Sequence, residues 1–417
     1  MKRYESYKPS GISWIGEIPS HWEVRKIRSL YALRTEKVSD KDFEPLSVSK
    51  QGVTPQLEDA VKTDNGDNRK LVHKGDFVVN SRSDRKGSCG VSDLDGSVSL
   101  INIVIYPITK LNPQYYHLLF RSNNYIEEFY RLGRGIVADL WTTKFDDMRN
   151  IFVPYPPIEE QKKIVEYLST KTSLIDAQQR ERERELRLLE ELKQAEIANV
   201  VTRGLNPDVP MKDSGIPWIG KIPSHWEVKR LGAFFNDNIS RNSDYKFDRA
   251  YKFNYGTIVP KNELGEVSDL RETYSKYSVL KQDDIIINGL NLNYDFVSQR
   301  VAISPTDCII TSAYIVLRPS SHTYSKYFLQ LFKAMDSKKL FHGMGTGIRL
   351  TLSFNELKSQ MLPIPPLEEQ RAIVEYIEQK NKAIDDMIAN LRAEIDFLTE
   401  YKQRLIADAV TGQIKID

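Results

Sequence analysis

The chain has 417 residues, of which 40% are hydrophobic and 10% aromatic. This length is too great for one ordinary domain and suits two domains with connecting segments. Lys and Arg number 59 against 57 Asp and Glu, so a strongly basic nucleic-acid-binding composition is excluded and any basic surface must be local. No apolar run reaches the roughly 20 residues of a membrane span, and no signal peptide is visible, so we expect a cytoplasmic protein without a membrane partner. The two cysteines lack metal-ligand spacing, so neither a zinc site nor a disulfide framework is expected.

The sequence contains two copies of one long pattern. SGISWIGEIPSHWEV at Ser10–Val24 returns as SGIPWIGKIPSHWEV at Ser214–Val228, with two of fifteen positions changed. We call these the tryptophan segments. PPIEEQKKIVEYL from Pro156 returns as PPLEEQRAIVEYI from Pro365. Solenoid repeats span roughly 20–50 residues, so this longer duplication indicates two whole domains with matched ends and diverged interiors.

The diverged interiors still follow one order of predicted elements. Residues rich in β-branched side chains predict strands at Leu71–Asn80 and Ser97–Ile108, with counterparts at Val279–Asn288 and Cys308–Pro319. Apolar residues at helical spacing predict helices at Gln114–Leu132 and Ser325–Phe341. A glycine turn follows each helix, Gly133-Arg134-Gly135-Ile136 in the first copy and Gly345-Thr346-Gly347-Ile348 in the second. Both interiors are therefore predicted to be α+β.

Each copy closes on a long helix with a heptad pattern. In the second helix one apolar set has no exception: Ile377, Ile384, Leu391, Leu398 and Leu405. The other set is Val374, Ile388, Ile395 and Ala409, with Asn381 and Lys402 as polar members. The first helix keeps the pattern with four interruptions, at Gln179, Arg182, Lys193 and Glu196. Such a seam is typical of a coiled coil, and Gly204 and Gly412 are placed to end the helices.

A helix of about 45 residues is about 65–70 Å long, too long to bury its seam against its own small domain. The simplest partner is the other helix of the same chain, which gives an antiparallel pair in which polar seam positions could fix the register. A coiled coil that joins two chains would use the same residues. The fold class predicted is α+β, with two similar domains joined by an antiparallel coiled coil in a pseudo-twofold arrangement. The predicted boundaries are 1–155, 156–204, 205–364 and 365–417.

The motifs of common catalytic sites are absent from the sequence. There is no GxxxxGK[ST] phosphate loop, no glycine-rich turn followed by an acidic ribose ligand, and no Asn-Pro-Pro-aromatic tetrapeptide of adenine methylation. His21 and His225 recur beside tryptophan, which favours a structural hydrogen bond over catalysis. We therefore expect a binding protein that is not an enzyme and holds neither metal nor cofactor.

The duplicated motifs resemble a known family. Two variable domains, each followed by PPIEEQ or PPLEEQ and a helix that ends in ANVVTRG or ADAVTGQ, look like the specificity subunit of Type I restriction–modification enzymes. The resemblance covers nearly the whole chain. Each motif alone is weak evidence, but all of them in this order and in two copies are specific to the family. One departure is Arg203 between Thr202 and Gly204, where the second copy runs directly from Thr411 to Gly412.

The resemblance implies a division of roles. Each variable domain would recognise one half of a split, asymmetric sequence in double-stranded DNA. The helices would set the gap between the half-sites and dock two methyltransferase subunits, with translocase–nuclease subunits completing the restriction complex. S-adenosylmethionine, ATP and Mg²⁺ would then belong to the partner subunits.

Candidate DNA-binding residues follow from the chemistry of base edges. Arg pairs with guanine and Asn or Gln with adenine, whereas Lys, Arg and backbone amides hold phosphates. The loop Ser81–Ser88 after the first predicted strand is basic, and the matching loop Asn288–Asp295 is rich in asparagine. The candidates in these loops and in the glycine turns are Arg82, Arg85, Lys86, Arg134, Asn288, Asn291, Asn293, Tyr294, Thr346 and Arg349.

Three alternatives remain open at this point. The chain could be the recognition subunit of a methyltransferase-only or fused system. It could be a coiled-coil scaffold without a DNA role, which the near-zero net charge favours and the unequal divergence of the interiors opposes. A stand-alone nuclease is the third, weakened by the absent motifs.

Overall fold

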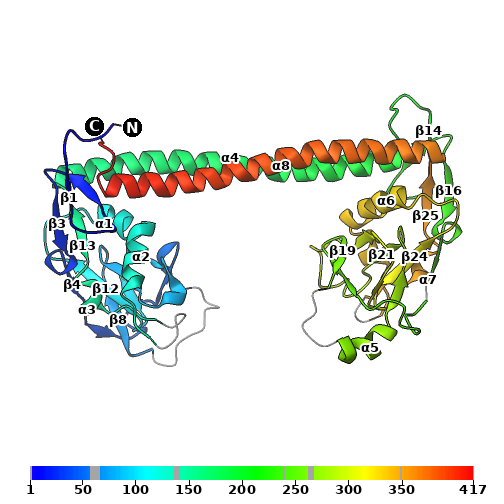
Figure 1. Cartoon of the computed structure of the whole chain (residues 1–417). Helices are drawn as coiled ribbons and strands as arrows, with labels where there is room; N and C mark the ends of the chain where they lie inside the picture. Colours follow the sequence, from blue (N-terminus) through cyan, green and yellow to red (C-terminus); the bar gives the residue numbers. More distant parts are fainter. Residues whose placement is uncertain are drawn as a thin grey trace. The chain divides into compact units, whose positions relative to one another are not determined.

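The computed structural model describes residues 2–56, 66–135, 141–237, 240–261, 267–347 and 350–416, with backbone only at 267–269. It divides into two compact units, Met1–Glu183 with Arg392–Asp417 (unit 1) and Arg184–Leu391 (unit 2). Each unit combines antiparallel strands with helices, which confirms the predicted α+β class (Figure 1). The domain boundaries predicted from the sequence stay a prediction, because the compact units divide within the long helices.

Unit 1 is built on a four-stranded antiparallel sheet in the order β10-β9-β12-β4 and a three-stranded sheet in the order β11-β8-β5. Three two-stranded ladders, β1-β2, β3-β13 and β6-β7, complete its strands. The strand bounds are β1 Tyr7–Pro9, β2 Glu17–Pro19, β3 Glu23–Lys26, β4 Tyr31–Leu33, β5 Lys37–Val38, β6 Leu46–Ser49, β7 Gly52–Pro55, β8 Arg69–Val72, β9 Phe77–Asn80, β10 Cys89–Val91, β11 Gly96–Val98, β12 Asn102–Pro107 and β13 Phe152–Tyr155. The helices are α1 Pro113–Phe120, α2 Asn123–Arg131, α3 Phe145–Met148 and the first part of α4 Ile158–Arg203.

Unit 2 repeats this plan with a four-stranded antiparallel sheet in the order β17-β24-β21-β22. Its two-stranded ladders are β14-β15, β16-β25, β18-β19 and β20-β23. The strand bounds are β14 Met211–Asp213, β15 Lys221–Pro223, β16 Glu227–Arg230, β17 Phe235–Asp237, β18 Tyr251–Asn254, β19 Thr257–Pro260, β20 Ser278–Leu280, β21 Ile285–Ile287, β22 Val301–Ile303, β23 Cys308–Ile310, β24 Ile315–Pro319 and β25 Met361–Ile364. The helices are α5 Val267–Ser275, α6 Ser325–Ser337, α7 Phe354–Leu357 and the first part of α8 Leu367–Val410.

Each long strand predicted from the sequence is in fact two short strands. The predicted strand Leu71–Asn80 is interrupted between β8 and β9, where the buried Asp76 accepts the backbone N–H of His73 at 2.8 Å and pairs with Arg34 at 2.6 Å. The predicted strand Val279–Asn288 of the second copy is interrupted in the same way, between β20 and β21, where the buried Asp284 pairs with Arg318 at 2.7 Å. A buried carboxylate needs such partners, and an arginine distant in sequence gives no local signal of the turn.

The predicted helix at Gln114–Leu132 was also too long, because α1 ends at Phe120 and α2 begins at Asn123. Ser122, which is buried, turns its hydroxyl back to the carbonyl of Leu119 at 2.7 Å and so ends the first helix. His117 near the end of α1 accepts the backbone N–H of Val91 through Nδ1 at 3.1 Å, and burial lowers the pKa of this imidazole to about 4. The break lets α1 and α2 cover the aromatic core of unit 1 from two directions.

The tryptophan segments are joined to the long helices by a repeated carboxylate. In unit 1 Glu160 accepts the indole N–H of Trp22 at 3.0 Å and contacts His21 Nε2 at 2.6 Å. In unit 2 Glu369 accepts the indole N–H of Trp226 at 2.9 Å and lies 2.8 Å from Nε2 of its histidine, His225. The histidines therefore have the structural role that the sequence predicted. This contact explains why the tryptophan segments and the PPxEEQ motifs are matched in both copies.

Each long helix ends against the tryptophan segment of the unit that holds its C-terminal end. Gly412 (φ +78°) ends α8 beside Trp22, and a Cβ there would lie 2.5 Å from Pro19 Cδ. Gly204 (φ +74°) ends α4 beside Trp226, and its Cβ would lie 2.7 Å from Glu369 Oε1. Positive φ and close approach both require glycine at these two helix ends. The chain termini meet in unit 1, where the N–H of Lys415 donates to the carbonyl of Lys2 at 3.0 Å (Figure 1).

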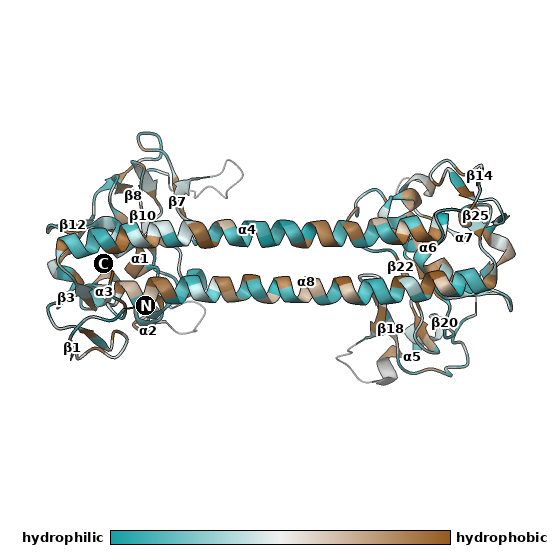
Figure 2. Ribbon diagram, turned by 90° about the horizontal axis from the view of Figure 1, so that it is seen from above, coloured by the Kyte–Doolittle hydropathy of each residue, from teal (hydrophilic) through white to brown (hydrophobic). Residues whose placement is uncertain are grey.

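The predicted apolar seam is present along both helices, whose faces alternate between polar and apolar residues (Figure 2). The members of the unbroken set on α8 are buried or half-buried throughout: Ile377, Ile384, Leu391, Leu398 and Leu405. On α4 the apolar seam residues Leu168 and Ile175 are buried in unit 1, and Val200 is buried in unit 2. Within each unit the two helices run antiparallel, because residues later on α4 contact residues earlier on α8.

All four polar interruptions of the first helix have a partner on α8. In unit 1 Gln179 donates to Thr399 Oγ1 at 2.7 Å, and Arg182 pairs with Glu394 at 3.0 Å. In unit 2 Lys193 pairs with Asp385 at 2.6 Å, and Glu196 accepts the hydroxyl of Tyr376 at 2.6 Å. Polar pairs within an apolar seam select one register over its neighbours, because a slip of one heptad would separate every pair. Among the described residues, no helix combines the length and hydropathy needed to cross a bilayer.

Candidate nucleic-acid interface

The structure brings the predicted loop and the predicted glycine turn of unit 1 together. The residue that follows β9 is Ser81, whose carbonyl accepts the N–H of Thr143 at 2.9 Å. On the other side of the same segment, Thr142 exchanges two backbone hydrogen bonds with Arg134, at 3.0 and 3.2 Å. The segment Trp141–Thr143 therefore lies between the loop that carries Arg82 and the turn that carries Arg134.

Unit 2 has the same arrangement built from different residues. The carbonyl of Gly289 accepts the N–H of Leu352 at 2.9 Å, and the N–H of Leu292 donates to the carbonyl of Leu350. On its other side this segment pairs with Thr346, which exchanges two hydrogen bonds with Thr351 at 2.9 and 3.0 Å. We call Ser81–Ser88 with Arg134 and Trp141–Thr143 the first candidate surface. The second candidate surface is Asn288–Asp295 with Thr346 and Leu350–Leu352.

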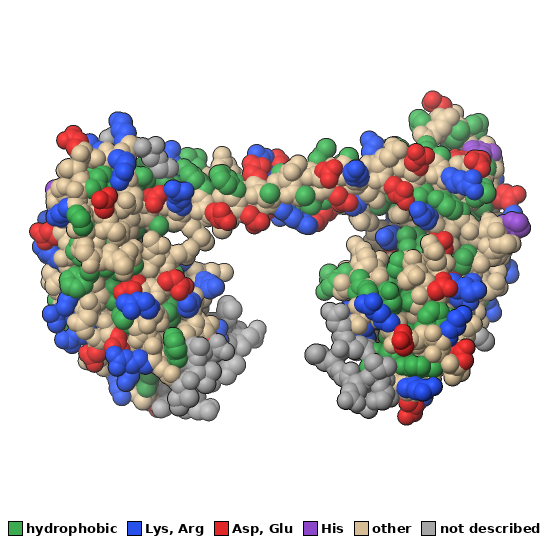
Figure 3. Space-filling model, viewed as in Figure 1, with side chains coloured by type: hydrophobic (Ala, Val, Ile, Leu, Met, Phe, Trp, Pro, Cys, Tyr) green, Lys and Arg blue, Asp and Glu red, His purple; other side chains and the backbone are tan. Residues whose placement is uncertain are grey.

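The cations of the first candidate surface are exposed and already paired with carboxylates. Arg82 and Arg85 both lie 3.6 Å from Asp84, and Lys86 lies 3.0 Å from Glu127. Arg134, whose side chain is 82% exposed, lies 3.0 Å from Asp147. Exposed ion pairs contribute little to stability, so phosphates or base edges could replace these carboxylates at low cost. Figure 3 shows basic and acidic side chains interspersed on the visible face of each unit, in keeping with the near-zero net charge.

In the second candidate surface the asparagines have three different environments. Asn288 is half-buried, and its carboxamide oxygen accepts the N–H of Leu290 at 3.1 Å, as Asn80 does for Arg82 in unit 1. Asn291 is exposed and holds a left-handed backbone (φ +53°). Among the described residues, Oδ1 of Asn293 is a buried oxygen without a hydrogen-bond partner.

The remaining candidates of the second surface are Tyr294, Thr346 and Arg349. Tyr294 is 79% exposed and Thr346 is exposed, whereas Arg349 lies outside the described residues. All ten residues stay predictions as DNA contacts, and the structure places the nine that lie in its described part. Arg82, Arg85, Lys86 and Arg134 share the first surface, and the others that are described share the second.

Sequence reasoning missed the residues that hold the two loops from beneath. Tyr130 on α2 donates its hydroxyl to the carbonyls of Asn80 and Arg85, at 2.8 and 3.3 Å. In unit 2 the buried Arg300 bonds to the carbonyls of the corresponding loop. Arg300 directly precedes β22, a strand that was not predicted from the sequence, and nothing in the local pattern indicated that its side chain is buried. The segments at Trp141 and Leu350 were missed because they approach the loops only through the fold.

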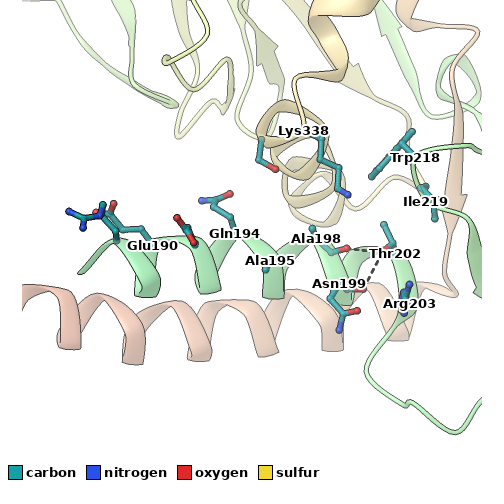
Figure 4. Close-up of a pocket in the computed structure, with 13 residues that line it drawn as sticks. Glu190, Gln194, Ala195, Ala198, Asn199, Thr202, Arg203, Trp218, Ile219 and Lys338 are labelled. Carbon is teal, nitrogen blue, oxygen red and sulfur yellow. Dashed lines mark hydrogen bonds between the residues drawn. The ribbon is translucent and has the colours of Figure 1, made fainter. Parts of the chain in front are cut away.

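A separate groove of about 860 Å³ lies in unit 2 between α4, the end of α6 and the second tryptophan segment (Figure 4). Ala195 and Ala198 line it from α4, with Trp218 opposite and Lys338 above. The hydroxyl of Thr202 donates to the carbonyl of Ala198 at 2.7 Å, so this hydroxyl already has a hydrogen-bond partner within α4. The lining mixes small apolar and charged side chains and suits a protein surface better than a small ligand.

Comparison with known proteins agrees with this two-part organisation. The family model of the Type I restriction modification DNA specificity domain matches residues 19–187 and again residues 223–396. The putative type I restriction enzyme MjaX specificity subunit of Methanocaldococcus jannaschii is 24% identical over 429 residues, which covers 96% of each chain. The type I restriction enzyme EcoBI specificity subunit of Escherichia coli is 24% identical over 296 residues, or 64% of this chain and 59% of that protein.

Two solved structures share the fold. A chain from the work described as the structural basis underlying complex assembly and conformational transition of the type I R-M system has a TM-score of 0.70 at 16% identity, covering 95% of this chain and 99% of that one. The HsdS subunit from Thermoanaerobacter tengcongensis has a TM-score of 0.53 at 18% identity, covering 95% and 98%. The duplicated fold and the two family matches, which together take in most of the chain, show that it belongs to the Type I restriction–modification DNA specificity family as a DNA-recognition subunit with two domains.

Proposed function

We propose that each unit recognises one block of a split DNA sequence, through its own candidate surface, and that the long helices dock methyltransferase subunits. The observation that carries the proposal is the contrast between the two surfaces. The same backbone arrangement carries Arg82 and Arg85 in unit 1 and Asn291 and Tyr294 in unit 2. Arginine and asparagine select different bases in the major groove, so the two units should recognise unlike blocks.

The chain itself offers a test, because its variable interiors can be exchanged at matched points. The N–H of Ile27 donates to the carbonyl of Ile151 at 3.0 Å, and the N–H of Leu231 donates to the carbonyl of Gln360 at 2.9 Å. The same backbone hydrogen bond therefore joins the two ends of each interior. We expect a chimaera that carries residues 27–151 in place of 231–360 to methylate a motif in which the first block occurs twice. The control is the reverse exchange, which should duplicate the second block; a motif unchanged in both chimaeras contradicts the proposal.

The proposed docking surface on the helices has exposed apolar pairs at helical spacing. In unit 1 Phe397 and Tyr401 stack with ring centroids 6.4 Å apart, and the side chain of Phe397 is 64% exposed. In unit 2 Leu188 and Leu192 are both about half exposed. Large apolar side chains in solvent are typical of surfaces that a protein partner covers. The name of one structural relative refers to complex assembly of the type I R-M system, which supports the same role here.

Replacing Phe397 with aspartate tests the docking surface, because a charge buried at an interface without a partner costs several kcal/mol. We expect the Phe397→Asp chain to lose copurification with the methyltransferase subunit by about 10-fold or more. The matched control is Ile108→Asp, an exposed apolar position of the same unit that is not on the long helices and should leave copurification unchanged. Equal copurification of wild type and Phe397→Asp would remove Phe397 from the docking surface.

Under this proposal the chain is a non-catalytic cytoplasmic subunit. S-adenosylmethionine, ATP and Mg²⁺ would act in the methyltransferase and translocase–nuclease partners. The purified chain with Mg²⁺ should leave duplex DNA intact, and cleavage by the chain alone would contradict this part of the proposal.

A further inference from the structure

The guanidinium of Arg300 donates hydrogen bonds to backbone carbonyls of the loop Asn288–Asp295. Its side chain is fully buried, and Nη1 donates to the carbonyls of Asn288 at 3.1 Å and Leu290 at 2.8 Å. Nη2 donates to the carbonyl of Asp295 at 2.7 Å and approaches that of Asn291 at 3.5 Å. One guanidinium thus contacts four carbonyls of one loop, which its planar fork of donors permits and a lysine ammonium does not.

Other side chains fix Arg300 and the far end of the loop. The N–H of Arg300 donates to Asp336 Oδ2 on α6 at 2.7 Å, and burial raises the pKa of Asp336. His342 contacts the carbonyl of Asp295 at 3.0 Å through Nε2 and stacks on Phe296, with ring centroids 4.7 Å apart. The backbone of Arg300 is therefore fixed to helix α6, and the far end of the loop is fixed to the 3-10 turn that follows α6.

Local hydrogen bonds shape the middle of the loop, where the N–H groups of Tyr294 and Asp295 donate to the carbonyl of Asn291, but Arg300 is the side chain that joins the two ends of the loop, Asn288 and Asp295. Asn291 occupies the left-handed region (φ +53°), which is unfavourable for most residues with a Cβ. Beyond it, Tyr294 is 79% exposed and Val297 is 89% exposed, so the outer part of the loop packs little against the unit. Loss of the guanidinium would remove the side-chain donor from the carbonyls of Asn288 and Leu290, which is unfavourable wherever water cannot replace it.

In unit 1 the corresponding loop is supported by a different residue on a different element. There the hydroxyl of Tyr130, from α2, donates to the carbonyls of Asn80 and Arg85. Arg300 instead directly precedes β22. The group that shapes each loop therefore belongs to the variable interior of its unit and not to the matched ends.

We propose that Arg300 is a specificity-determining positioning residue for the DNA block recognised by unit 2, acting through the backbone of Asn288–Asp295, and that Tyr130 has the corresponding role in unit 1. This inference rests on the proposed function. Arg300 itself is too buried to touch DNA, so its contribution is the placement of Asn291, Asn293 and Tyr294.

The test is base discrimination by the full chain assembled with its methyltransferase subunit. Duplexes carry one wrong base in either block, and a wrong base ordinarily weakens binding roughly 10- to 100-fold. For Arg300→Lys, which keeps the charge and loses the fork, we expect this penalty to shrink to less than about 3-fold in the second block only. The penalty in the first block and the salt dependence of binding should stay as in wild type, since phosphate contacts are unaffected. Tyr130→Phe is the matched control and should relax the first block only.

The outcomes separate the inference from the proposed function. Wild type without discrimination in the second block would overturn the proposed function. Wild-type discrimination in a folded Arg300→Lys chain, or equal loss in both blocks, would overturn the positioning role. If Arg300→Lys does not fold, Tyr130→Phe decides, because it removes only the hydroxyl that donates to the corresponding loop of unit 1. Relaxed discrimination in the first block supports the inference, and unchanged discrimination contradicts it.

Discussion

Alanine at both Arg82 and Arg85 should abolish recognition of the first DNA block while the preference for the second block stays intact. Both guanidinium groups lie on the loop after β9, each 3.6 Å from Asp84, and the side chains of Arg82 and Arg85 are 40% and 67% exposed. An arginine bidentate to guanine contributes about 1–3 kcal/mol of discrimination, so loss of two such contacts would reduce it by roughly 10²- to 10⁴-fold. The effect should be confined to one block, because unit 2 has its own surface.

The measurement is competition binding by the assembled complex, with duplexes altered in one block at a time. Asp84→Asn is the control, since it removes the carboxylate between the two arginines and leaves both cations in place. It should retain or strengthen binding to the first block. Equal loss of both blocks in the double alanine chain would show that the loop is structural.

Removal of one heptad from both long helices has the second large expected effect. The deletion is best made at residues 181–187 of α4 and 390–396 of α8, because it removes Arg182 together with its partner Glu394 and keeps Leu188 and Phe397 of the proposed docking surface. The flanking pairs Gln179–Thr399 and Lys193–Asp385 can then re-form in the shortened seam. Seven residues at 1.5 Å each correspond to about three base pairs of DNA.

We therefore expect the original motif to lose methylation and the new motif to have a gap about three base pairs shorter. Methylation of the new motif should be weaker, because three base pairs also rotate one block by about 100° around the DNA axis. Deletion from α4 alone is the control; it leaves the polar pairs out of register and should destabilise the chain. An unchanged motif in the double deletion would rule out the helices as a spacer.

The parts of the fold that the sequence predicted depend on local pattern. The heptads predicted the seam because the packing of two long helices needs apolar residues at most seam positions along about 45 residues. Gly204 and Gly412 marked the helix ends because only glycine readily adopts their positive φ. The tryptophan–histidine pair and the PPxEEQ motif recur together because Glu160 and Glu369, which belong to PPxEEQ, bind both side chains.

The parts that could not be predicted depend on contacts between distant residues. Asp76 and Asp284 interrupt strands that their β-branched neighbours favour, because Arg34 and Arg318 neutralise these carboxylates within the fold. Within the candidate site, the sequence indicated the positions of the two loops but not the side chains that support them. Arg300 has no local pattern to distinguish it from a surface arginine, and its role depends on carbonyls that only the folded loop presents.

The central claim is that one chain recognises two unlike DNA blocks, one with each unit. The most direct measurement is to express the chain with its methyltransferase subunit in a host without other adenine methylation and to map methylated adenines across the genome. The account predicts a single motif of two different short blocks separated by a fixed number of unspecified base pairs. A motif of one continuous block, or methylation without sequence preference, would contradict it.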